Sequence, residues 1–363
     1  MRLLTSSTET TGVGKYALEL LSELDKLVHI HVFSDGAWPQ GARMDKPVQV
    51  LSRGPFWQHT TYVRAIRRSE VDLVHSLAYT IPAGLGVPTV VTVHDLGFRV
   101  SPETVSPATR RYLRALVPAS LRRADMVIVP STAVRDQLIS EYKTQSDKLA
   151  VVHHGLGNTF LHAHCSVHQT HKAGVDTRTR PYILAVGTQE PRKNLPRAVE
   201  ALSLLVRRDP HFPYDLVIAG KHGPDARKIS EIASQRGIEG RIERLGYVSD
   251  NELVDLYRSA ALLVYPSFFE GFGMPVLEAM SMGCPVVVSA RPSLPEVAGD
   301  AAVYVDPLDP ADIAKGILEG LANRSKYAAA GYKRLELFSW EAAAQRTVEV
   351  YEEARARHHR SAH

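Results

Sequence analysis

Two acidic residues, Glu270 and Glu278, have the types and spacing best suited to hold a polar ligand. They open and close the run EGFGMPVLE, which lies between two apolar segments. Pro275 suits the first turn of a helix, where its missing N–H costs nothing, and Gly283 suits a left-handed cap at the helix end. We therefore predict that Glu270 lies in a loop facing a cleft and that Glu278 lies about one turn inside a helix.

Glycines in the same run favour close approach of a ligand to the backbone. Gly271 and Gly273 carry no Cβ, so backbone N–H groups around them can reach a ligand. The helix that follows offers unpaired donors and the positive end of its dipole to an anion. The run thus offers one acid for neutral hydroxyls, a second acid deeper in the site and an anion site between them. This combination predicts a pocket for a sugar–phosphate ester.

The longer string that contains this run carries a family resemblance. YPSFFEGFGMPVLEAMSMGCPV, which begins at Tyr265, resembles the E-x7-E signature of retaining GT-B glycosyltransferases of the family-four type, which transfer sugars from nucleotide diphosphate donors. Two glutamates at this spacing are a weak signal by themselves, and the alternative is an ordinary strand–loop–helix turn with two surface acids. The whole string is far more specific, and the resemblance covers nearly the full chain.

The resemblance implies a role for each part of this run. Glu270 orients the donor sugar through its hydroxyls, and the backbone N–H groups of Phe272, Gly273 and Met274 assist it. Glu278 binds the ribose hydroxyls. Neither glutamate is the nucleophile of a double displacement; the acceptor attacks from the face that the diphosphate leaves, so the anomeric configuration is retained.

A second segment, GTQEPRKN at 187–194, supplies cations. A diphosphate leaving group gains negative charge as the glycosidic bond breaks, so fixed cations stabilise the transition state more than the ground state. Family members of this type use Arg and Lys instead of a bound metal, and Lys193 matches the family lysine. The family often places its arginine directly after the glycine, where this chain has Thr188, so Arg192 is the second candidate. Cations are unfavourable at a helix start, which suggests that an anion binds here.

His94 ends a predicted strand at the carboxyl edge, where open α/β sheets bind ligands. A lone histidine at a strand end is more often structural, but the resemblance implies that His94 contacts the donor sugar or the acceptor side of the reaction centre. Asp95 has the alternative of capping the following loop. After another predicted strand, Tyr247 and Val248 are expected near the nucleobase, whose identity these residues do not reveal.

The segment GVGKYA at 12–17 has rival interpretations. As a phosphate-binding P-loop it fails, because tyrosine follows its lysine. As a dinucleotide fingerprint it gives Gly12-x-Gly14-x-x-Ala17 with Asp35 after the next strand, which supports an NAD(P)-dependent oxidoreductase as the alternative function. The loop before Gly12 is too long for the tight turn of that fingerprint. In the glycosyltransferase interpretation, the N–H of Gly14 lies near the donor phosphates.

Short apolar segments alternate with helical patterns along the chain, which predicts parallel sheets with helices on both faces. The predicted strands are residues 2–5, 30–34, 73–75, 89–94, 126–130, 148–153, 182–186, 216–219, 241–245, 262–265, 286–289 and 302–305. A polar, non-periodic stretch at 161–180 suggests a linker.

The fold class expected is therefore α/β, with two Rossmann-like parallel-sheet domains facing across a cleft, the GT-B architecture. The domains are 1–160 on the acceptor side and 181–339 for donor binding, and by resemblance the helix 340–357 packs back on the first.

Composition narrows the functional class. The 363 residues are 44% hydrophobic and 23% charged with a net charge of +4, which is typical of globular proteins and does not indicate nucleic-acid binding. Two cysteines and no signal-like or membrane-spanning segment suggest a cytoplasmic protein. A basic helical segment at 110–123 is either a solvated face or a surface that lies on the inner face of an anionic membrane.

Five potential metal ligands cluster within the linker but match no standard zinc spacing, so no metal site is predicted. They are His162, His164, Cys165, His168 and His171.

The function we expect is transfer of a hexose from a nucleotide diphosphate sugar to a hydroxyl of a glycan or lipid-linked acceptor. The GTQEPRKN form resembles mannosyltransferases of bacterial polysaccharide assembly, so GDP-mannose is the first expected donor and a UDP-sugar the second, with no other cofactor. A non-catalytic sugar-nucleotide-binding relative is a third alternative. The acceptor and the oligomeric state have no readable signal.

Overall fold

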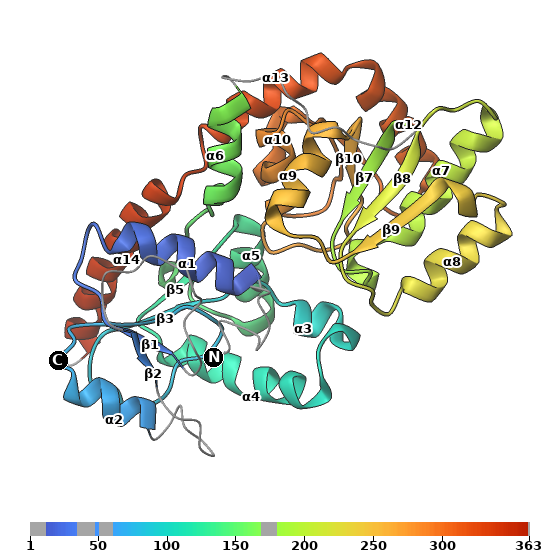
Figure 1. The fold of residues 1–363 in the computed structure, drawn as a ribbon. Coiled ribbons are helices and arrows are strands. Elements are labelled where there is room, and N and C mark those ends of the chain that lie inside the picture. Colours follow the sequence, from blue (N-terminus) through green and yellow to red (C-terminus); the bar gives the residue numbers. More distant parts are fainter. Residues whose placement is uncertain (1–11, 35–47, 51–60, 168–179, 362–363) are drawn as a thin grey trace. The chain divides into compact units, whose positions relative to one another are not determined.

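The computed structural model describes residues 12–34, 48–50, 61–167 and 180–361, and it divides the chain into two compact units. Unit 1 comprises residues 1–99, 106–155 and 338–363, and unit 2 comprises residues 100–105 and 156–337. Every strand pair among the described residues is parallel, in both units. The predicted α/β class with two parallel-sheet domains is therefore confirmed (Figure 1).

Unit 1 contains a two-stranded sheet and a four-stranded sheet with the order β3-β4-β5-β6. Its strands are β1 (Val32–Ser34), β2 (Val48–Val50), β3 (Val74–Ser76), β4 (Thr89–Thr92), β5 (Met126–Val129) and β6 (Leu149–Val151). Its helices are α1 (Gly12–Leu24), α2 (Thr61–Arg68), α4 (Pro107–Arg123), α5 (Thr132–Tyr142), η3 (Ser146–Lys148) and α14 (Trp340–Ser361), while α3 (Gly97–Val100) ends just past the unit boundary.

Unit 2 contains a six-stranded sheet with the order β12-β11-β10-β7-β8-β9. Its strands are β7 (Tyr182–Val186), β8 (Asp215–Ala219), β9 (Ile242–Gly246), β10 (Leu262–Tyr265), β11 (Val286–Ser289) and β12 (Ala302–Val305). Its helices are η2 (Pro102–Thr104), α6 (Asn158–Val167), η4 (Pro191–Lys193), α7 (Leu195–Arg208), α8 (Ala226–Gln235), η5 (Glu239–Arg241), α9 (Asp250–Ser259), α10 (Met274–Ser281), α11 (Leu294–Ala298), η6 (Gly299–Ala301), α12 (Pro310–Ala322) and α13 (Arg324–Leu335).

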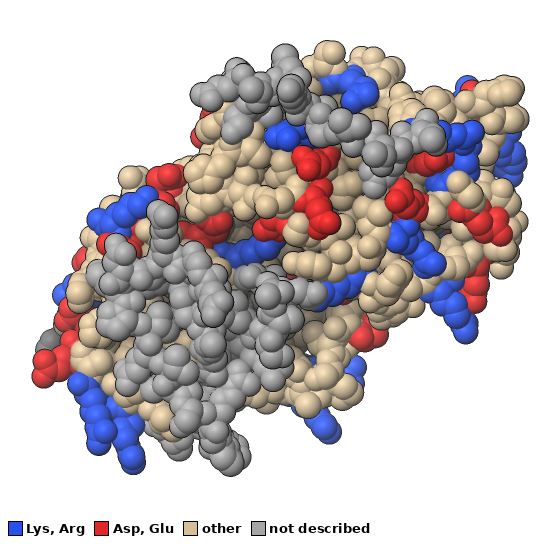
Figure 2. All heavy atoms as spheres, viewed as in Figure 1, with Lys and Arg blue, Asp and Glu red and all other residues tan. Residues whose placement is uncertain are grey.

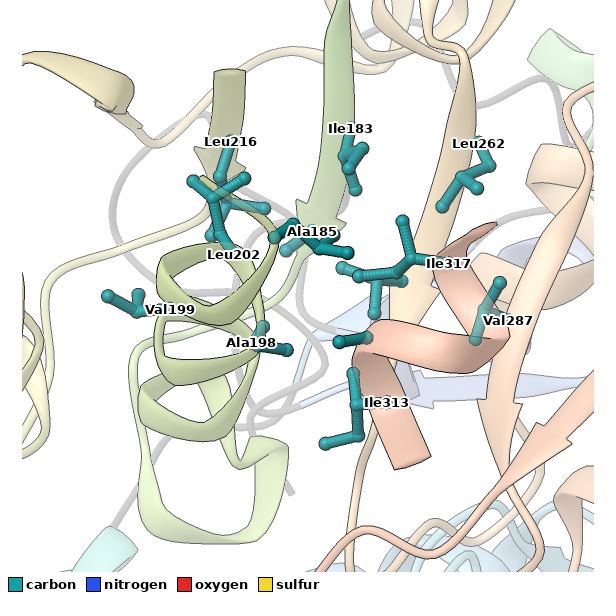
Figure 3. Packing of buried hydrophobic residues seen from close by; sticks show 14 of the residues in the cluster. Ile183, Ala185, Ala198, Val199, Leu202, Leu216, Leu262, Val287, Ile313 and Ile317 are labelled. Carbon is teal, nitrogen blue, oxygen red and sulfur yellow. The ribbon is translucent and has the colours of Figure 1, made fainter. Parts of the chain in front are cut away.

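The central strands of unit 2 are apolar along their whole length because helices cover both faces of the sheet. Ile183 and Ala185 of β7 point to one face, where α7 and α12 pack on them through Leu202 and Ile317 (Figure 3). Tyr182 points to the other face, where its hydroxyl donates to the carbonyl of Leu256 in α9 at 2.8 Å. A strand buried on both sides is thereby held rigid, which fixes the loops that leave its end.

The core of unit 1 joins the first and last described helices of the chain. Tyr16 and Leu20 of α1 pack with Trp340 and Ala344 of α14 over Val90 of β4. Figure 1 shows α1 and α14 side by side over the sheet. The C-terminal helix is therefore part of unit 1, although the chain that precedes it belongs to unit 2.

Element bounds largely follow the sequence expectations. The strands predicted at 182–186, 262–265, 286–289 and 302–305 are confirmed to the residue. In unit 1, the strands predicted at 30–34, 89–94, 126–130 and 148–153 are shortened by one to three residues, and the one predicted at 73–75 is shifted by one residue. The strand β2 was not predicted, and the strand predicted at 2–5 lies outside the described residues. A run of apolar residues predicts the bounds of a strand buried on both faces more accurately than the bounds of a short strand.

One sequence expectation needs correction. The stretch predicted as a linker from 161 begins instead inside α6, which runs from Asn158 to Val167. Its polar composition hid the helix, because α6 is held partly by a polar contact: His164 Nδ1 lies 2.8 Å from the carbonyl oxygen of Ser281. Residues 168–179 of the predicted linker lie outside the described part of the chain.

Charged side chains of both signs are interspersed over the face drawn in Figure 2, in keeping with the small net charge. Within the described ranges, none of the helices is both long and apolar enough to cross a lipid bilayer.

Candidate active site

Two loops of unit 2 meet where the strand order of its sheet reverses. β7 pairs with β8 on one side and with β10 on the other, so the loops after β7 and β10 leave neighbouring carboxyl ends in a doubly wound sheet. Ligands of open α/β sheets bind in the crevice at this switch point. The loop after β7 carries Arg192 and Lys193, and the loop after β10 carries Glu270.

The three charged residues form one cluster, in which Lys193 and Glu270 are buried and Arg192 is half-buried. Lys193 Nζ lies 2.7 Å from Glu270 Oε1, and Arg192 Nη1 lies 2.9 Å from Glu270 Oε2. The Tyr265 hydroxyl donates to Glu270 Oε1 at 2.7 Å and accepts from Lys193 Nζ at 2.5 Å. Arg192 Nε also pairs with Glu190 at 2.6 Å. Glu270 and Lys193 are each only 7% exposed, so their charges interact with little solvent screening.

One carboxylate facing two cations explains the protonation states of this cluster. Burial would raise the pKa of Glu270, but Lys193 and then Arg192 outweigh it and lower that pKa to about 2. Burial lowers the pKa of Lys193, and Glu270 offsets this effect only in part while Arg192 adds to it. Burial and the nearby Glu270 raise the pKa of Tyr265 well above its ordinary value, so its hydroxyl stays protonated.

The cations do not occupy the start of a regular α-helix, as the sequence suggested, but a 3-10 turn, η4, that precedes α7. The anion that accompanies them in the structure is the Glu270 carboxylate, supplied by the loop after β10. Asn194 ends this turn in the left-handed region, with φ 57°. Its side-chain amide donates to the carbonyls of Pro266 and Pro307, at 3.0 and 2.8 Å, which ties the cationic loop to its neighbours.

Glu278 lies where the sequence predicted, one turn into α10, and it is buried. The hydroxyl of Tyr257 in α9 donates to Glu278 Oε2 at 3.0 Å, which fixes this carboxylate. α10 ends as predicted: Gly283 has φ 68°, its N–H donates to Met280, and the next N–H donates to Ala279. This is the Schellman arrangement that glycine favours.

Glycine is needed at the start of α10 for two reasons. Gly273 has φ 116°, a conformation that residues with side chains avoid. A Cβ on Gly273 would also lie 2.8 Å from Leu294 Cδ2. Phe272 next to it is buried, and Met274 begins the helix. The backbone at 272–274 is therefore at the helix N-terminus, as the donor-binding prediction requires, and donor binding by its N–H groups stays a prediction.

Residues at the ends of β8 and β9 mark a second part of the same sheet edge. Gly220 N–H donates to the Gly246 carbonyl at 2.7 Å, which holds the two strand ends together. Tyr247 follows and is 50% exposed, with Lys221 Nζ 5.4 Å from its ring centroid. Val248 is partly exposed. An exposed ring beside a cation is suited to a planar ligand, and the nucleobase role of these residues stays a prediction.

In unit 1, His94 follows β4 and is buried. Its Nε2 donates to the Leu77 carbonyl at 2.8 Å, so Nδ1 is the unprotonated nitrogen. Burial lowers the pKa of His94, and the bond to Leu77 opposes that effect only in part. His94 is thus a neutral imidazole able to accept a hydrogen bond. Asp95 accepts from the Gly97 N–H at 2.9 Å and from Tyr79, which is the loop-capping alternative.

The glycines of the N-terminal turn lie in helix α1, which begins at Gly12, and Gly14 is buried in its first turn. Asp35, the ribose-binding residue of the oxidoreductase alternative, lies outside the described residues. The histidine-rich stretch is only partly described, and the described part of the chain contains no group of His, Cys, Asp and Glu arranged to hold a metal ion.

Comparisons with known proteins agree with this geometry. Residues 10–157 match the family described as Glycosyltransferase Family 4, and residues 168–335 match Glycosyl transferases group 1. The chain is 31% identical to the O-antigen chain mannosyltransferase B of Escherichia coli, over 94% of this chain and 96% of that protein. The chain belongs to the glycosyltransferase family. This glycosyltransferase is also 31% identical to the O-antigen chain mannosyltransferase RfbU of Salmonella typhimurium, over 82% of its own length and 84% of the relative.

Solved structures show the same fold. The sucrose-phosphate synthase of Thermosynechococcus elongatus matches the glycosyltransferase with a TM-score of 0.70 at 21% identity, over 96% of this chain and 94% of that one. The predicted GT-B fold is thereby confirmed. The oxidoreductase alternative finds no support in these comparisons.

Several residues of the glycosyltransferase site were not singled out from the sequence. Tyr265, Glu190 and Tyr257 contact the predicted charged groups, and Ser293 contacts the Glu270 backbone. Tyr265 carried a usable signal, since a hydroxyl-bearing residue ends an otherwise aliphatic strand. Glu190 lies two residues before Arg192 in the segment 187–194. Tyr257 and Ser293 come from segments that only the tertiary structure brings to the site.

Proposed function

We propose that the enzyme transfers mannose from GDP-mannose to a hydroxyl of a glycan or lipid-linked acceptor, with retention of configuration and without a metal ion. The relatives named above are mannosyltransferases, which supports mannose as the sugar. A UDP-sugar is the second candidate donor, because the exposed Tyr247 ring would stack on either base.

The observation that carries the proposal is the charged cluster of Lys193, Arg192 and Glu270 at the switch point of the unit 2 sheet. In the proposed reaction the bond between the sugar C1 and the β-phosphate oxygen breaks, and its electrons go to that oxygen. The acceptor oxygen bonds to C1 on the same face, and its proton goes to the departing phosphate. Lys193 and Arg192 stabilise the charge that develops on this phosphate.

In the free enzyme, the charges within the cluster keep Lys193 and Arg192 paired before the donor binds. Lys193 and Arg192 are balanced by Glu270 and Glu190, so no bound anion is needed to keep the two cations paired. A diphosphate entering the site competes with the two carboxylates for the cations. Glu270 is then free to accept hydrogen bonds from the sugar hydroxyls, while Glu278, held by Tyr257, binds the ribose. The roles of His94, Gly14, Tyr247 and Val248 in this scheme are predictions.

Replacement of Lys193 by alanine tests the scheme. Loss of one charge-stabilising donor costs about 10²–10³ in kcat in comparable sites, so we expect a fall of that order with donor affinity changed only a few-fold. Lys228→Ala, an exposed lysine on α8, is the matched control. Near-normal turnover of Lys193→Ala with intact donor binding would refute the role.

The donor and the reaction class are tested directly on the full chain. Calorimetric titration with GDP-mannose, UDP-sugars and NAD(H) separates the donors and the oxidoreductase alternative. Release of nucleotide from the bound donor excludes a non-catalytic relative. The anomeric configuration of the product, read by NMR, tests retention, and undiminished turnover after exhaustive chelation tests independence from metal.

A surface of unit 1 supports contact with an anionic membrane. α4 carries five arginines and no acidic residue, and the exposed ones include Arg111, Arg114, Arg122 and Arg123. The helix also exposes Tyr112, an aromatic residue of the kind found at lipid interfaces. Cys165 and Cys284 are free thiols, which suits a reducing compartment. We place the enzyme in the cytoplasm, with α4 against the inner face of the membrane.

A further inference from the structure

Ser293 has a backbone conformation that is rare for a residue with a side chain. Its φ is 76° and its ψ is −42°. Lys143 and Asn194 also have positive φ, but with ψ of 33° and 31° they lie in the left-handed helical region. Ser293 lies outside that region. Such conformations are unfavourable and persist only where the surrounding structure holds them, often at functional sites.

The side chain of Ser293 has a specific partner. It is 2% exposed, and its hydroxyl donates to the backbone carbonyl of Glu270 at 2.9 Å. Ser293 also precedes α11, yet its side chain makes no capping hydrogen bond to that helix. The hydroxyl therefore serves the acidic loop rather than the helix that it precedes.

The next residue supports the same loop at its other end. Leu294 Cδ2 lies so close to Gly273 that a Cβ there would be 2.8 Å away. Ser293 and Leu294 thus contact both ends of the loop 270–273, one through a hydrogen bond and the other through packing. Lys193 and Arg192 contact the carboxylate of Glu270, and Ser293 contacts its backbone carbonyl.

We infer that Ser293 is a positioning residue for transfer: its hydroxyl holds the Glu270 backbone so that the carboxylate meets the donor sugar. This inference rests on the proposed role of Glu270. A glycine at this position would adopt the same backbone without strain but would lose the hydrogen bond. The unfavourable backbone conformation of Ser293 therefore accompanies a hydrogen bond that only a side chain can make to the Glu270 carbonyl.

Two substitutions separate the strain from the hydrogen bond. Ser293→Gly removes both, and Ser293→Ala removes only the hydrogen bond. We expect kcat to fall roughly tenfold in both variants, the rate equivalent of about 1.4 kcal/mol. The apparent melting temperature should rise or hold in the glycine variant, because the strain is relieved, and should fall by a few degrees in the alanine variant.

Binding provides a readout that a merely structural role would not change. Glu270 is proposed to hold the sugar and Glu278 the ribose, so both Ser293 variants should bind GDP-mannose several-fold more weakly but GDP alone with unchanged affinity. Ser203→Ala is the matched control, since that buried hydroxyl donates to the carbonyl of Glu200 within α7. This control should keep normal turnover.

The outcomes distinguish the two levels of the argument. Normal turnover of Ser293→Gly overturns the inference, as does an equal loss of affinity for GDP and GDP-mannose. Glu270→Ala is measured beside them: if that variant keeps normal turnover, the proposed role of Glu270 is wrong and the inference falls with it. If Glu270→Ala is inactive while Ser293→Gly is normal, only the inference about Ser293 fails.

Discussion

Replacement of Tyr265 by phenylalanine removes a single hydroxyl from the centre of the charged cluster. That hydroxyl lies 2.7 Å from Glu270 Oε1 and 2.5 Å from Lys193 Nζ, and all three side chains are buried. The ring remains at the end of β10 and keeps its contact with the lysine, whose Nζ lies 4.8 Å from the ring centroid. We therefore expect the variant to fold.

The magnitude follows from the contacts that remain. A hydrogen bond to a charged group contributes about 1.5–3 kcal/mol. Because Lys193 and Glu270 still touch each other at 2.7 Å, neither is left unpaired, and the lower value applies. One pKa unit corresponds to about 1.4 kcal/mol. Loss of an acceptor disfavours the ammonium form, so the pKa of Lys193, which burial already lowers, should fall by about one further unit.

The assay is the pH dependence of kcat/KM, followed as nucleotide release from the donor. The alkaline limb of kcat/KM reports loss of the Lys193 charge in the free enzyme, where Lys193 contacts Glu270, so it should move to lower pH by about one unit in Tyr265→Phe. Tyr182→Phe is the matched control, because it removes a buried hydroxyl that donates to the Leu256 carbonyl at the other end of the sheet. An unshifted alkaline limb in a folded Tyr265→Phe enzyme would show that the hydroxyl does not support the lysine charge.

Three further predictions concern stability and membrane contact. Burial and then the nearby His94 lower the pKa of His75 to about 3. As the pH falls below 6.5, a proton therefore binds to His75 in the unfolded chain but not in the folded protein. At pH 5.5 this difference should lower the free energy of unfolding by about 1.4 kcal/mol relative to pH 7.5. In urea titrations at the two pH values, His75→Gln should shrink that loss, and an unchanged loss contradicts the assignment. Gln189 is 0% exposed and its amide atoms have no hydrogen-bond partner among the described residues. Gln189→Leu should therefore stabilise the protein by about 1 kcal/mol and raise its melting temperature by about 2–4 °C. A melting temperature below that of the unchanged protein, measured by calorimetry, would refute this prediction. The double substitution Arg111→Ser and Arg114→Ser should weaken binding to vesicles containing anionic lipid by about 30-fold, at about 1 kcal/mol per charge. The same change at Arg207 and Arg208 on α7 should have no effect on vesicle binding. Equal losses of vesicle affinity in the two variants would mean that α4 is not the membrane contact.

Much of the fold could be predicted because burial on both faces leaves a mark on consecutive residues. Segments such as Leu262–Tyr265 and Val286–Ser289 are apolar throughout, and their bounds were predicted to the residue. The short strand β2 and the helix α6 left weaker marks. Polar side chains along α6 take part in its packing, as the contact of His164 with Ser281 shows, so a polar composition was mistaken for a linker.

The candidate site divides in the same way. Glu270, Glu278, Arg192 and Lys193 were singled out from the sequence, because each lies in a run whose glycines, proline or basic residues are unusual. Most of the partners that hold them were not, and Tyr257 is the clearest case, since no feature of the chain near Tyr257 indicates a contact with Glu278.

The amino-acid sequence by itself determined which segments form the strands of unit 2, where α10 begins and ends, and which loops carry acids and cations. These properties depend on a few consecutive residues. Only the tertiary structure decided that Lys193 faces Glu270, 77 positions along the chain. The physical reason is the strand order: β10 pairs with β7, and that pairing depends on how all the strands and helices pack together, which no local stretch of the chain encodes.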